Sequence, residues 1–134
     1  MSSPRDAILA VTFRCNAHCV MCNAWQSRRA DALRPEHVRK LPPDLRTVNL
    51  TGGEPFLRDD LPAFVGELRA RCPRARITIS TNASLPERVE RMMDEIVCLD
   101  PAVRLAVSLD GVGAAHDRVR GIEGAFDAAV GVID

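Results

Sequence analysis

Short apolar runs alternate with amphipathic segments along this 134-residue chain. The first run, Ala7–Phe13, is nearly continuous, which is typical of a strand buried on both faces of a parallel sheet. Three further runs, at 47–51, 76–80 and 103–109, are short and rich in β-branched or alternating apolar residues. The pattern therefore predicts four strands.

Helical patterns fill the segments between the predicted strands. Apolar residues recur at helical spacing after Asp59-Asp60, whose carboxylates we expect to cap the helix. A second amphipathic helix begins at Pro86, residues 19–41 are expected to be helical in pieces, and a last helix begins near Gly124. The apolar residues of the first two helices are Leu61, Phe64, Val65, Leu68, Val89, Met92, Met93, Ile96 and Val97.

The alternation of strands and helices at intervals of roughly 30 residues predicts an α/β fold, in which four βα units form a parallel sheet with right-handed crossovers. In such sheets, binding and catalytic groups gather at the carboxyl ends of the strands. The helix from Gly124 reaches Asp134 without a terminating glycine or proline. We therefore expect residues 1–134 to be the N-terminal part of a domain that is incomplete at its C-terminus.

The charge of the chain gives little indication of a partner. Its 18 basic and 18 acidic residues balance, which argues against binding to nucleic acid. No apolar run reaches the roughly 18 residues that a membrane helix needs, and the first residues lack the order of a signal peptide. The five cysteines, an odd number without an export signal, indicate reduced thiols. We therefore expect a cytoplasmic protein.

Three cysteines follow the first predicted strand at C-x3-C-x2-C spacing: Cys15, Cys19 and Cys22. Three thiolates so close in sequence can converge on one metal centre. A structural zinc site would need a fourth ligand, and neither Cys72 nor Cys98 has a partner at C-x2-C spacing. A cubane iron–sulfur cluster fits the count better, because three cysteines hold three irons and leave the fourth iron open. A small structural zinc-binding module remains the alternative.

Three further motifs follow in order, each at the end of a predicted strand. They are Thr51-Gly52-Gly53-Glu54-Pro55, Ser80-Thr81-Asn82-Ala83 and Ser108-Leu109-Asp110-Gly111. Together with the cysteine spacing, they resemble the radical S-adenosylmethionine (SAM) enzymes over essentially the whole chain from Ala7 on. The resemblance implies part of a partial (β/α)6 TIM-like barrel, of which about four βα units are present.

The resemblance also implies the chemistry. In that family a [4Fe-4S] cluster binds SAM, and reductive cleavage of SAM gives a 5'-deoxyadenosyl radical that abstracts hydrogen from a substrate. The expected cofactors are therefore a [4Fe-4S] cluster and SAM. The expected partners are a reductant such as flavodoxin or ferredoxin and a substrate, a peptide or a small molecule, that no segment of the sequence identifies.

By this resemblance, the residues that bind SAM lie at the strand ends. Glycines after a strand allow positive φ and a close approach of the backbone to a ligand, so the Gly52-Gly53 pair would receive the methionyl amino group, with Glu54 shaping the loop. Asn82 and Ser108 offer uncharged hydrogen-bonding groups, although turn formation is the alternative for both. Met21 could cover the adenine, since a thioether packs well against aromatic rings. The full set is Met21, Gly52, Gly53, Glu54, Pro55, Asn82 and Ser108 for SAM, with Cys15, Cys19 and Cys22 for the cluster.

The segment after the last of these motifs completes a longer pattern, D-G-x4-H-D-x-x-R-G, formed by Asp110, Gly111, His116, Asp117, Arg120 and Gly121. It resembles the peptide-modifying branch of the family that carries auxiliary clusters in a C-terminal, SPASM-like extension, although those extra cysteines are absent from this sequence. Arg120 would contact a carboxylate of SAM or of the substrate, or would belong to a surface loop. His18 is expected to face solvent, and Cys72 and Cys98 are expected to be buried.

Overall fold

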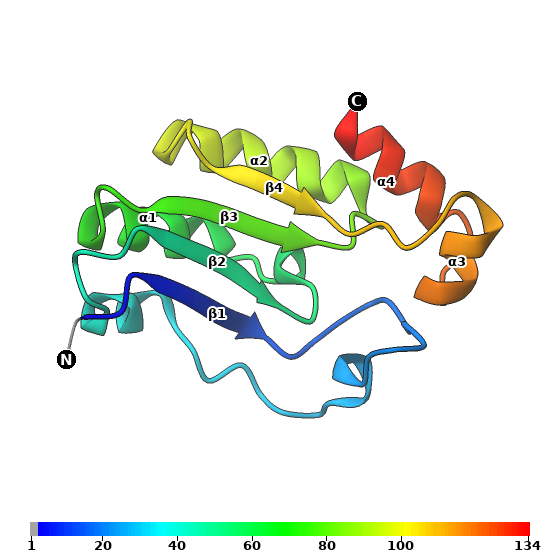
Figure 1. Cartoon of the computed structure of the whole chain (residues 1–134), viewed down its shortest axis with the longest axis horizontal. Coiled ribbons are helices and arrows are strands. Elements are labelled where there is room, and N and C mark those ends of the chain that lie inside the picture. The colour runs from blue at the N-terminus through cyan, green and yellow to red at the C-terminus, as the bar shows by residue number, and fades with distance from the viewer. Residues whose placement is uncertain (1–2) are drawn as a thin grey trace.

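One parallel sheet organises the computed structural model of the chain, which describes residues 3–134 (Figure 1). Its strands are β1 (Asp6–Thr12), β2 (Thr47–Gly52), β3 (Arg76–Thr81) and β4 (Arg104–Val107). They lie in the order β1-β2-β3-β4, and each neighbouring pair is parallel. The predicted α/β fold with four parallel strands is confirmed, although β4 is shorter than the run at 103–109.

Within residues 3–134, helices lie between successive strands and after β4. The α-helices are α1 (Leu61–Arg71), α2 (Pro86–Leu99), α3 (Ala114–Arg120) and α4 (Ala125–Ile133). The 3₁₀ helices are η1 (Ala24–Gln26), η2 (Pro35–Lys40) and η3 (Pro55–Leu57). The first two 3₁₀ helices are the helical pieces expected in residues 19–41. No helix in the described part of the chain is both long and apolar enough to cross a membrane.

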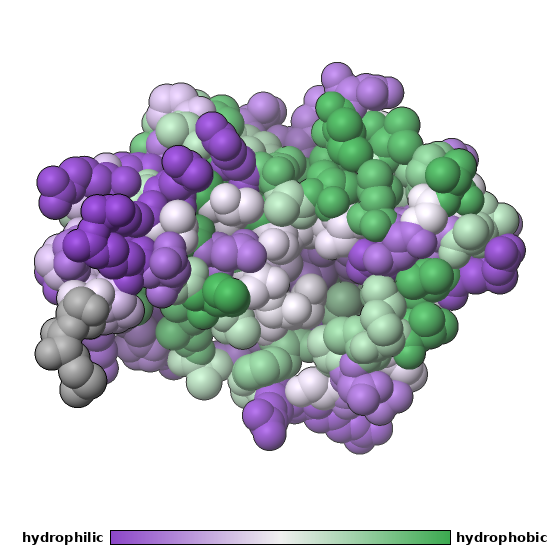
Figure 2. Space-filling view, viewed as in Figure 1, coloured by the Kyte–Doolittle hydropathy of each residue, from purple (hydrophilic) through white to green (hydrophobic). Residues whose placement is uncertain are grey.

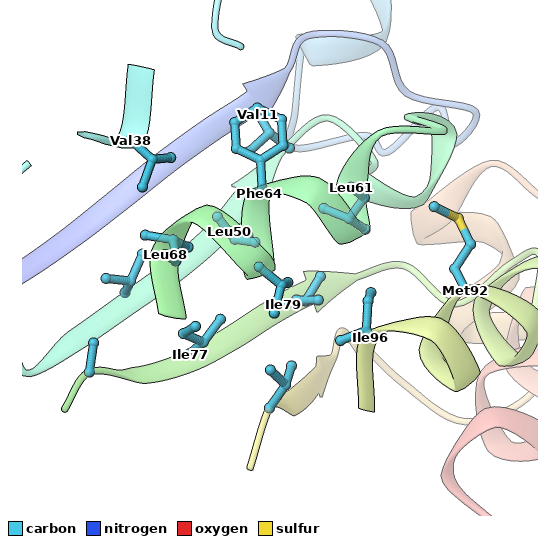
Figure 3. Packing of buried hydrophobic residues seen from close by; sticks show 14 of the residues in the cluster. Val11, Val38, Leu50, Leu61, Phe64, Leu68, Ile77, Ile79, Met92 and Ile96 are labelled. Carbon is cyan, nitrogen blue, oxygen red and sulfur yellow. The ribbon is translucent and has the colours of Figure 1, made fainter. Parts of the chain in front are cut away.

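The apolar faces of α1 and α2 pack on the same face of the sheet (Figure 1, Figure 3). Leu50, Ile77 and Ile79 belong to β2 and β3 and are fully buried. Phe64 from α1 and Ile96 from α2 are buried in the same cluster. Full burial of one such side chain stabilises a fold by about 1.5–3 kcal/mol. This layer therefore holds the strands in register and fixes where their carboxyl ends lie.

The two helices leave the opposite face of the sheet uncovered. Ile8 on β1 is 74% exposed, whereas Val11 is 1% exposed. The prediction that this strand is buried on both faces is therefore wrong, because helices cover one face only. Figure 2 looks onto the uncovered face, where pale residues of intermediate hydropathy lie along its middle. Residues on this face of the other strands are Asn49, Thr78, Ser80 and Ala106.

The carboxylates before α1 do not cap it, contrary to prediction. Asp60 stands at the N-cap position, but its side chain pairs with Arg58 at an Oδ2–Nη2 distance of 2.6 Å. Asp59 pairs with an arginine of α2 at 2.6 Å. The buried Arg58 also donates from Nη1 to the carbonyl oxygens of Val11 (2.6 Å) and Leu33 (2.8 Å). The Asp60 carboxylate pairs with the guanidinium because a buried charge without a partner costs more free energy than an uncapped helix end that water can reach.

We predict that Ile79→Ala lowers the free energy of unfolding by about 2–5 kcal/mol, because it leaves a cavity in the fully buried layer. Ile8→Ala, on the uncovered face, is the matched control and should change that free energy by less than about 0.5 kcal/mol. Urea unfolding followed by circular dichroism measures both values. Equal losses for the two variants would contradict the assignment of the covered and uncovered faces.

Candidate functional site

The carboxyl ends of the strands and the loop after β1 surround one cavity of about 160 Å³. The lining residues are Cys15, Ala17, Cys19, Met21, Cys22, Ala24, Thr51, Gly52, Gly53, Ser80, Thr81, Asn82, Ser108 and Arg120. The cavity thus brings together all three predicted cluster ligands and most of the residues predicted to bind SAM. Glu54 and Pro55, which belong to the same prediction, lie behind the lining.

Each thiol of the cysteine loop, residues 15–22, lies near an N–H donor. The donor–sulfur pairs are Asn82 Nδ2 with Cys15 (3.9 Å), Arg120 Nη1 with Cys19 (3.5 Å) and the Ala24 backbone N with Cys22 (3.4 Å). Donors of this kind stabilise negative charge on sulfur, as hydrogen bonds to metal-bound thiolates do in other proteins. Burial raises the pKa of the Cys15 thiol, so this group favours its protonated form.

The Gly52-Gly53 pair packs directly against the start of the cysteine loop. The Gly53 N–H donates to the carbonyl oxygen of Thr12 at 2.9 Å, and the next N–H donates to that of Arg14 at 2.8 Å. A Cβ on Gly52, whose φ is +131°, would overlap the Thr12 carbonyl oxygen. A Cβ on Gly53 would overlap the Arg14 carbonyl oxygen and lie 3.0 Å from Cys15 Cβ. The cysteine loop itself therefore requires both glycines, a role that the sequence analysis missed.

The Glu54 carboxylate anchors this glycine turn to the end of β3. The residue is 2% exposed, and its carboxylate accepts hydrogen bonds from backbone and side-chain donors. The donors are the Asn82 N–H (2.7 Å), the Thr81 hydroxyl (2.9 Å) and the Phe56 N–H (3.1 Å). Burial raises the pKa of Glu54, and these hydrogen bonds act in the opposite direction. Glu54 therefore shapes the loop from behind, while the glycine backbone faces the cavity.

Asn82, Ser108 and Met21 reach the cavity in different ways. Asn82 Nδ2 donates to Asn16 Oδ1 at 3.0 Å, and its Oδ1 accepts from the Ser84 N–H at 3.0 Å. The Asn82 side chain thus ties the cysteine loop to the end of β3. The Ser108 N–H donates to the last residue of β3 at 3.0 Å and extends the ladder between β3 and β4 up to the cavity. Met21 lies at the cavity edge and is 59% exposed.

Arg120 belongs to the site, so the surface-loop alternative for it is wrong. Its side chain is 12% exposed and lines the cavity, and its Nη2 lies 2.6 Å from Asp110 Oδ2. The Asp110 N–H donates to Nδ1 of the fully buried His116 at 3.1 Å. Asp117 accepts two backbone N–H groups at the start of α4 (2.8 and 2.9 Å), which hold its pKa below the usual value. The residues of the D-G-x4-H-D-x-x-R-G pattern therefore form α3 and the polar contacts that hold this short helix at the site.

The carboxyl end of α3 holds the middle of the cysteine loop, whereas the glycines pack against its start. The His18 N–H donates to the carbonyl oxygen of Arg120 at 2.9 Å, and the Val20 N–H donates to that of Val119 at 3.0 Å. Gly121 follows with a φ of +67°, and a Cβ there would lie 2.9 Å from the His18 carbonyl oxygen. Residues far apart in the sequence therefore fix the backbone on both sides of the second cysteine.

Several neighbouring predictions have mixed outcomes. His18 is exposed, as expected, and its ring meets Trp25 edge-on with centroids 4.9 Å apart. Cys72 is buried, as expected, whereas Cys98 is exposed. The prediction for Cys98 is wrong because it lies two residues after the buried Ile96, about 200° around the helix and away from the sheet. The helical period of the sequence alone already indicates that Cys98 faces away from the sheet.

The donor set of the cavity fits an iron–sulfur cluster and a cofactor that carries a carboxylate group. Three thiols border one shared space, each beside an N–H donor. The Nε of Arg120 is buried and has no acceptor within residues 3–134, and a negatively charged group in the cavity would suit it. In the same residues, no three cysteine, histidine, aspartate or glutamate side chains are arranged around a single metal ion.

Sequence comparisons identify relatives across nearly the whole chain. The family model described as Radical SAM superfamily matches residues 9–134. Fe-coproporphyrin III synthase of Methanosarcina barkeri (strain Fusaro / DSM 804) is 37% identical over 127 residues, which cover 90% of this chain and 31% of that enzyme. GTP 3',8-cyclase of Synechococcus sp. (strain CC9902) is 32% identical over 142 residues, which cover 94% of this chain and 38% of that enzyme. The chain thus spans about a third of the length of these curated relatives.

A solved structure matches the fold. The crystal structure of Streptococcus suis SuiB bound to S-adenosylmethionine superimposes with a TM-score of 0.76 at 18% sequence identity. The match covers 94% of this chain and 30% of that chain. At this identity the likeness concerns the fold alone, and it agrees with the predicted fold class.

We predict that Gly53→Ala lowers the free energy of unfolding by about 1–3 kcal/mol, because the new methyl group forces the cysteine loop away. Gly131→Ala is the matched control, since nothing lies within 4 Å of its Cβ position in α4 and the change should be neutral or stabilising by up to about 1 kcal/mol. Urea unfolding measures both effects. Equal stability of the two variants would show that the glycine turn can move without cost.

Proposed function

The chain belongs to the radical SAM superfamily, and we propose that it binds a [4Fe-4S] cluster through Cys15, Cys19 and Cys22, with SAM at the iron that these cysteines leave open. Enzymes of this family use these two cofactors. When both are bound, reductive cleavage of SAM supplies a 5'-deoxyadenosyl radical that takes hydrogen from a substrate. The observation that carries the proposal is the convergence of the three thiols and the strand ends on one cavity.

The chain's own residues would bind and orient these cofactors. The backbone of Gly52-Gly53 lines the cavity without side chains, so its carbonyl oxygens would accept hydrogen bonds from the ammonium group of SAM. Asn82 and Ser108 add amide and hydroxyl groups at the next two strand ends. Met21 at the cavity edge offers a thioether to the adenine ring. Glu54 keeps the glycine turn in place from behind.

We propose that the substrate lies along the uncovered face of the sheet. Ser80 lines the cavity and also donates from Oγ to Asn49 Oδ1 at 3.0 Å, so this residue joins the cavity edge to the polar groups of this face. Asn49, Thr78 and Ser80 are half-buried and uncharged. Such groups suit a polar peptide or small molecule. Peptides are included because SuiB, one of the solved structures that share this fold, has also been crystallised with a precursor peptide, SuiA.

We further propose that residues 1–134 form the N-terminal part of a radical SAM core. Within the described residues β4 has a neighbour on one side only, and an open parallel edge leaves backbone groups free to pair with a further strand. Reaction on the substrate would then need further βα units, in keeping with the greater length of the relatives. A reductant such as flavodoxin or ferredoxin would supply the electron, in the cytoplasm, where thiols stay reduced.

We predict that anaerobic reconstitution with iron and sulfide yields one four-iron cluster per chain, and that Cys15→Ala, Cys19→Ala and Cys22→Ala each abolish it. Cys72→Ala and Cys98→Ala are the controls, since neither residue lines the cavity, and both should keep the cluster. Iron and sulfide analysis with visible absorption measures the outcome. Stoichiometric zinc in a colourless protein after anaerobic purification would favour the alternative, a structural zinc module, and would contradict the proposal.

We predict that SAM changes the electron paramagnetic resonance spectrum of the reduced cluster, because its amino and carboxylate groups would bind the open iron. Adenosine is the matched control, since it has the same purine and ribose without those two groups, and it should leave the spectrum unchanged. If SAM binds, as equilibrium dialysis would show, and the spectrum does not change, SAM is held elsewhere and the proposal of chelation fails.

A further inference from the structure

A charged side chain touches the sulfur of one cluster ligand. Nη1 of Arg120 lies 3.5 Å from the Cys19 sulfur, while Nη2 lies 2.6 Å from Asp110 Oδ2. The arginine side chain is 12% exposed and that of Asp110 is 32% exposed. The guanidinium therefore stands between a thiol and a carboxylate, with the carboxylate on the side nearer to water.

The fold holds this guanidinium in place before any cofactor is present. The backbone carbonyl of Arg120 accepts from the His18 N–H at 2.9 Å, which ties the backbone of Arg120 to the loop one residue before Cys19, and the ion pair with Asp110 holds the guanidinium itself. Asp110 is fixed in turn, because its N–H donates to Nδ1 of the buried His116 at 3.1 Å. Two independent contacts thus keep the charge pair beside the second cysteine.

The position of the pair has an electrostatic consequence for any cluster at this site. Adding one electron to a cluster held by three thiolates increases its negative charge, and a nearby cation stabilises that reduced state. A hydrogen bond to a ligating sulfur acts in the same direction. The Asp110 carboxylate opposes the effect, more weakly because it touches the far nitrogen and is more exposed to solvent.

We propose that Arg120 and Asp110 form a charge pair that sets the reduction potential of the cluster bound by Cys19, with Arg120 favouring the reduced state and Asp110 limiting that preference. Arg120 is in this sense a positioning residue, which acts through the Cys19 sulfur. The inference rests on the proposed cluster site and adds to it the group that makes the one-electron reduction accessible to a biological reductant.

The two members of the pair should act with opposite sign. Arg120→Gln removes the cation and should lower the ratio of reduced to oxidised cluster about tenfold at a fixed ambient potential, a shift of about 59 mV for a one-electron couple. Asp110→Asn leaves the cation without its counter-charge and should raise that ratio. The double variant should fall between the two single variants.

The measurement is a redox titration of the reconstituted chain, monitored by electron paramagnetic resonance without SAM. Arg118→Gln is the matched control, because Arg118 is exposed on the same helix and the variant loses the same charge. It should change the ratio less than about twofold, since solvent screens an exposed charge. Iron analysis of each sample ensures that the variants are compared with the cluster fully loaded.

Shifts of Arg120→Gln and Asp110→Asn in the same direction, or unchanged potentials in both with four irons bound, would overturn the inference while leaving the proposed cluster site intact. If Arg120→Gln loads no cluster, Asp110→Asn and Arg120→Lys decide the question. Asp110→Asn must still raise the ratio of reduced to oxidised cluster, and Arg120→Lys, which keeps the charge, must change that ratio by clearly less than the tenfold expected for loss of the charge. An unchanged chain that holds no four-iron cluster would instead refute the proposed function itself.

Discussion

The close packing of the glycine turn on the start of the cysteine loop is the constraint on which the site depends. Without side chains at positions 52 and 53, the two backbones come close enough for direct hydrogen bonds to Thr12 and Arg14. The buried Glu54 then links this contact to the end of β3. One turn therefore sets the positions of the first cysteine, the glycine backbone and Asn82 relative to each other, and a rigid support of this kind is what cofactor chemistry requires.

Two arginines with little exposed surface complete the frame around this contact. Arg58 joins the end of β1, the segment at Leu33 and the start of α1, and Arg120 joins α3 to the second cysteine. Each of them has a carboxylate partner, because a guanidinium taken out of water needs one. The loops at the carboxyl edge of the sheet are thus held by directional polar contacts, while α1 and α2 hold the sheet itself through apolar burial.

The sequence predicted the fold, and it pointed to three thiols that the structure brings to one cavity, because these signals are local. Periodic apolar residues locate the strands and helices, and the three cysteines lie within eight positions. It failed where the answer depends on distant partners. The apolar run at 7–13 does not reveal that helices cover only one face of the sheet. Asp60 has the sequence position of a helix cap, but its carboxylate pairs with Arg58 instead. The placement of Arg120 beside Cys19 needs α3 to fold back over the loop, which no spacing rule expresses.

In the proposed site, three cysteines hold three irons of a cubane and leave the fourth to SAM. Mössbauer spectroscopy of the chain reconstituted with iron-57 distinguishes these irons, because it counts the irons that share one environment. We expect SAM to change the signal of one iron in four and to leave the other three unchanged. Four irons that all keep the same signal with SAM bound, or a single mononuclear site, would contradict it.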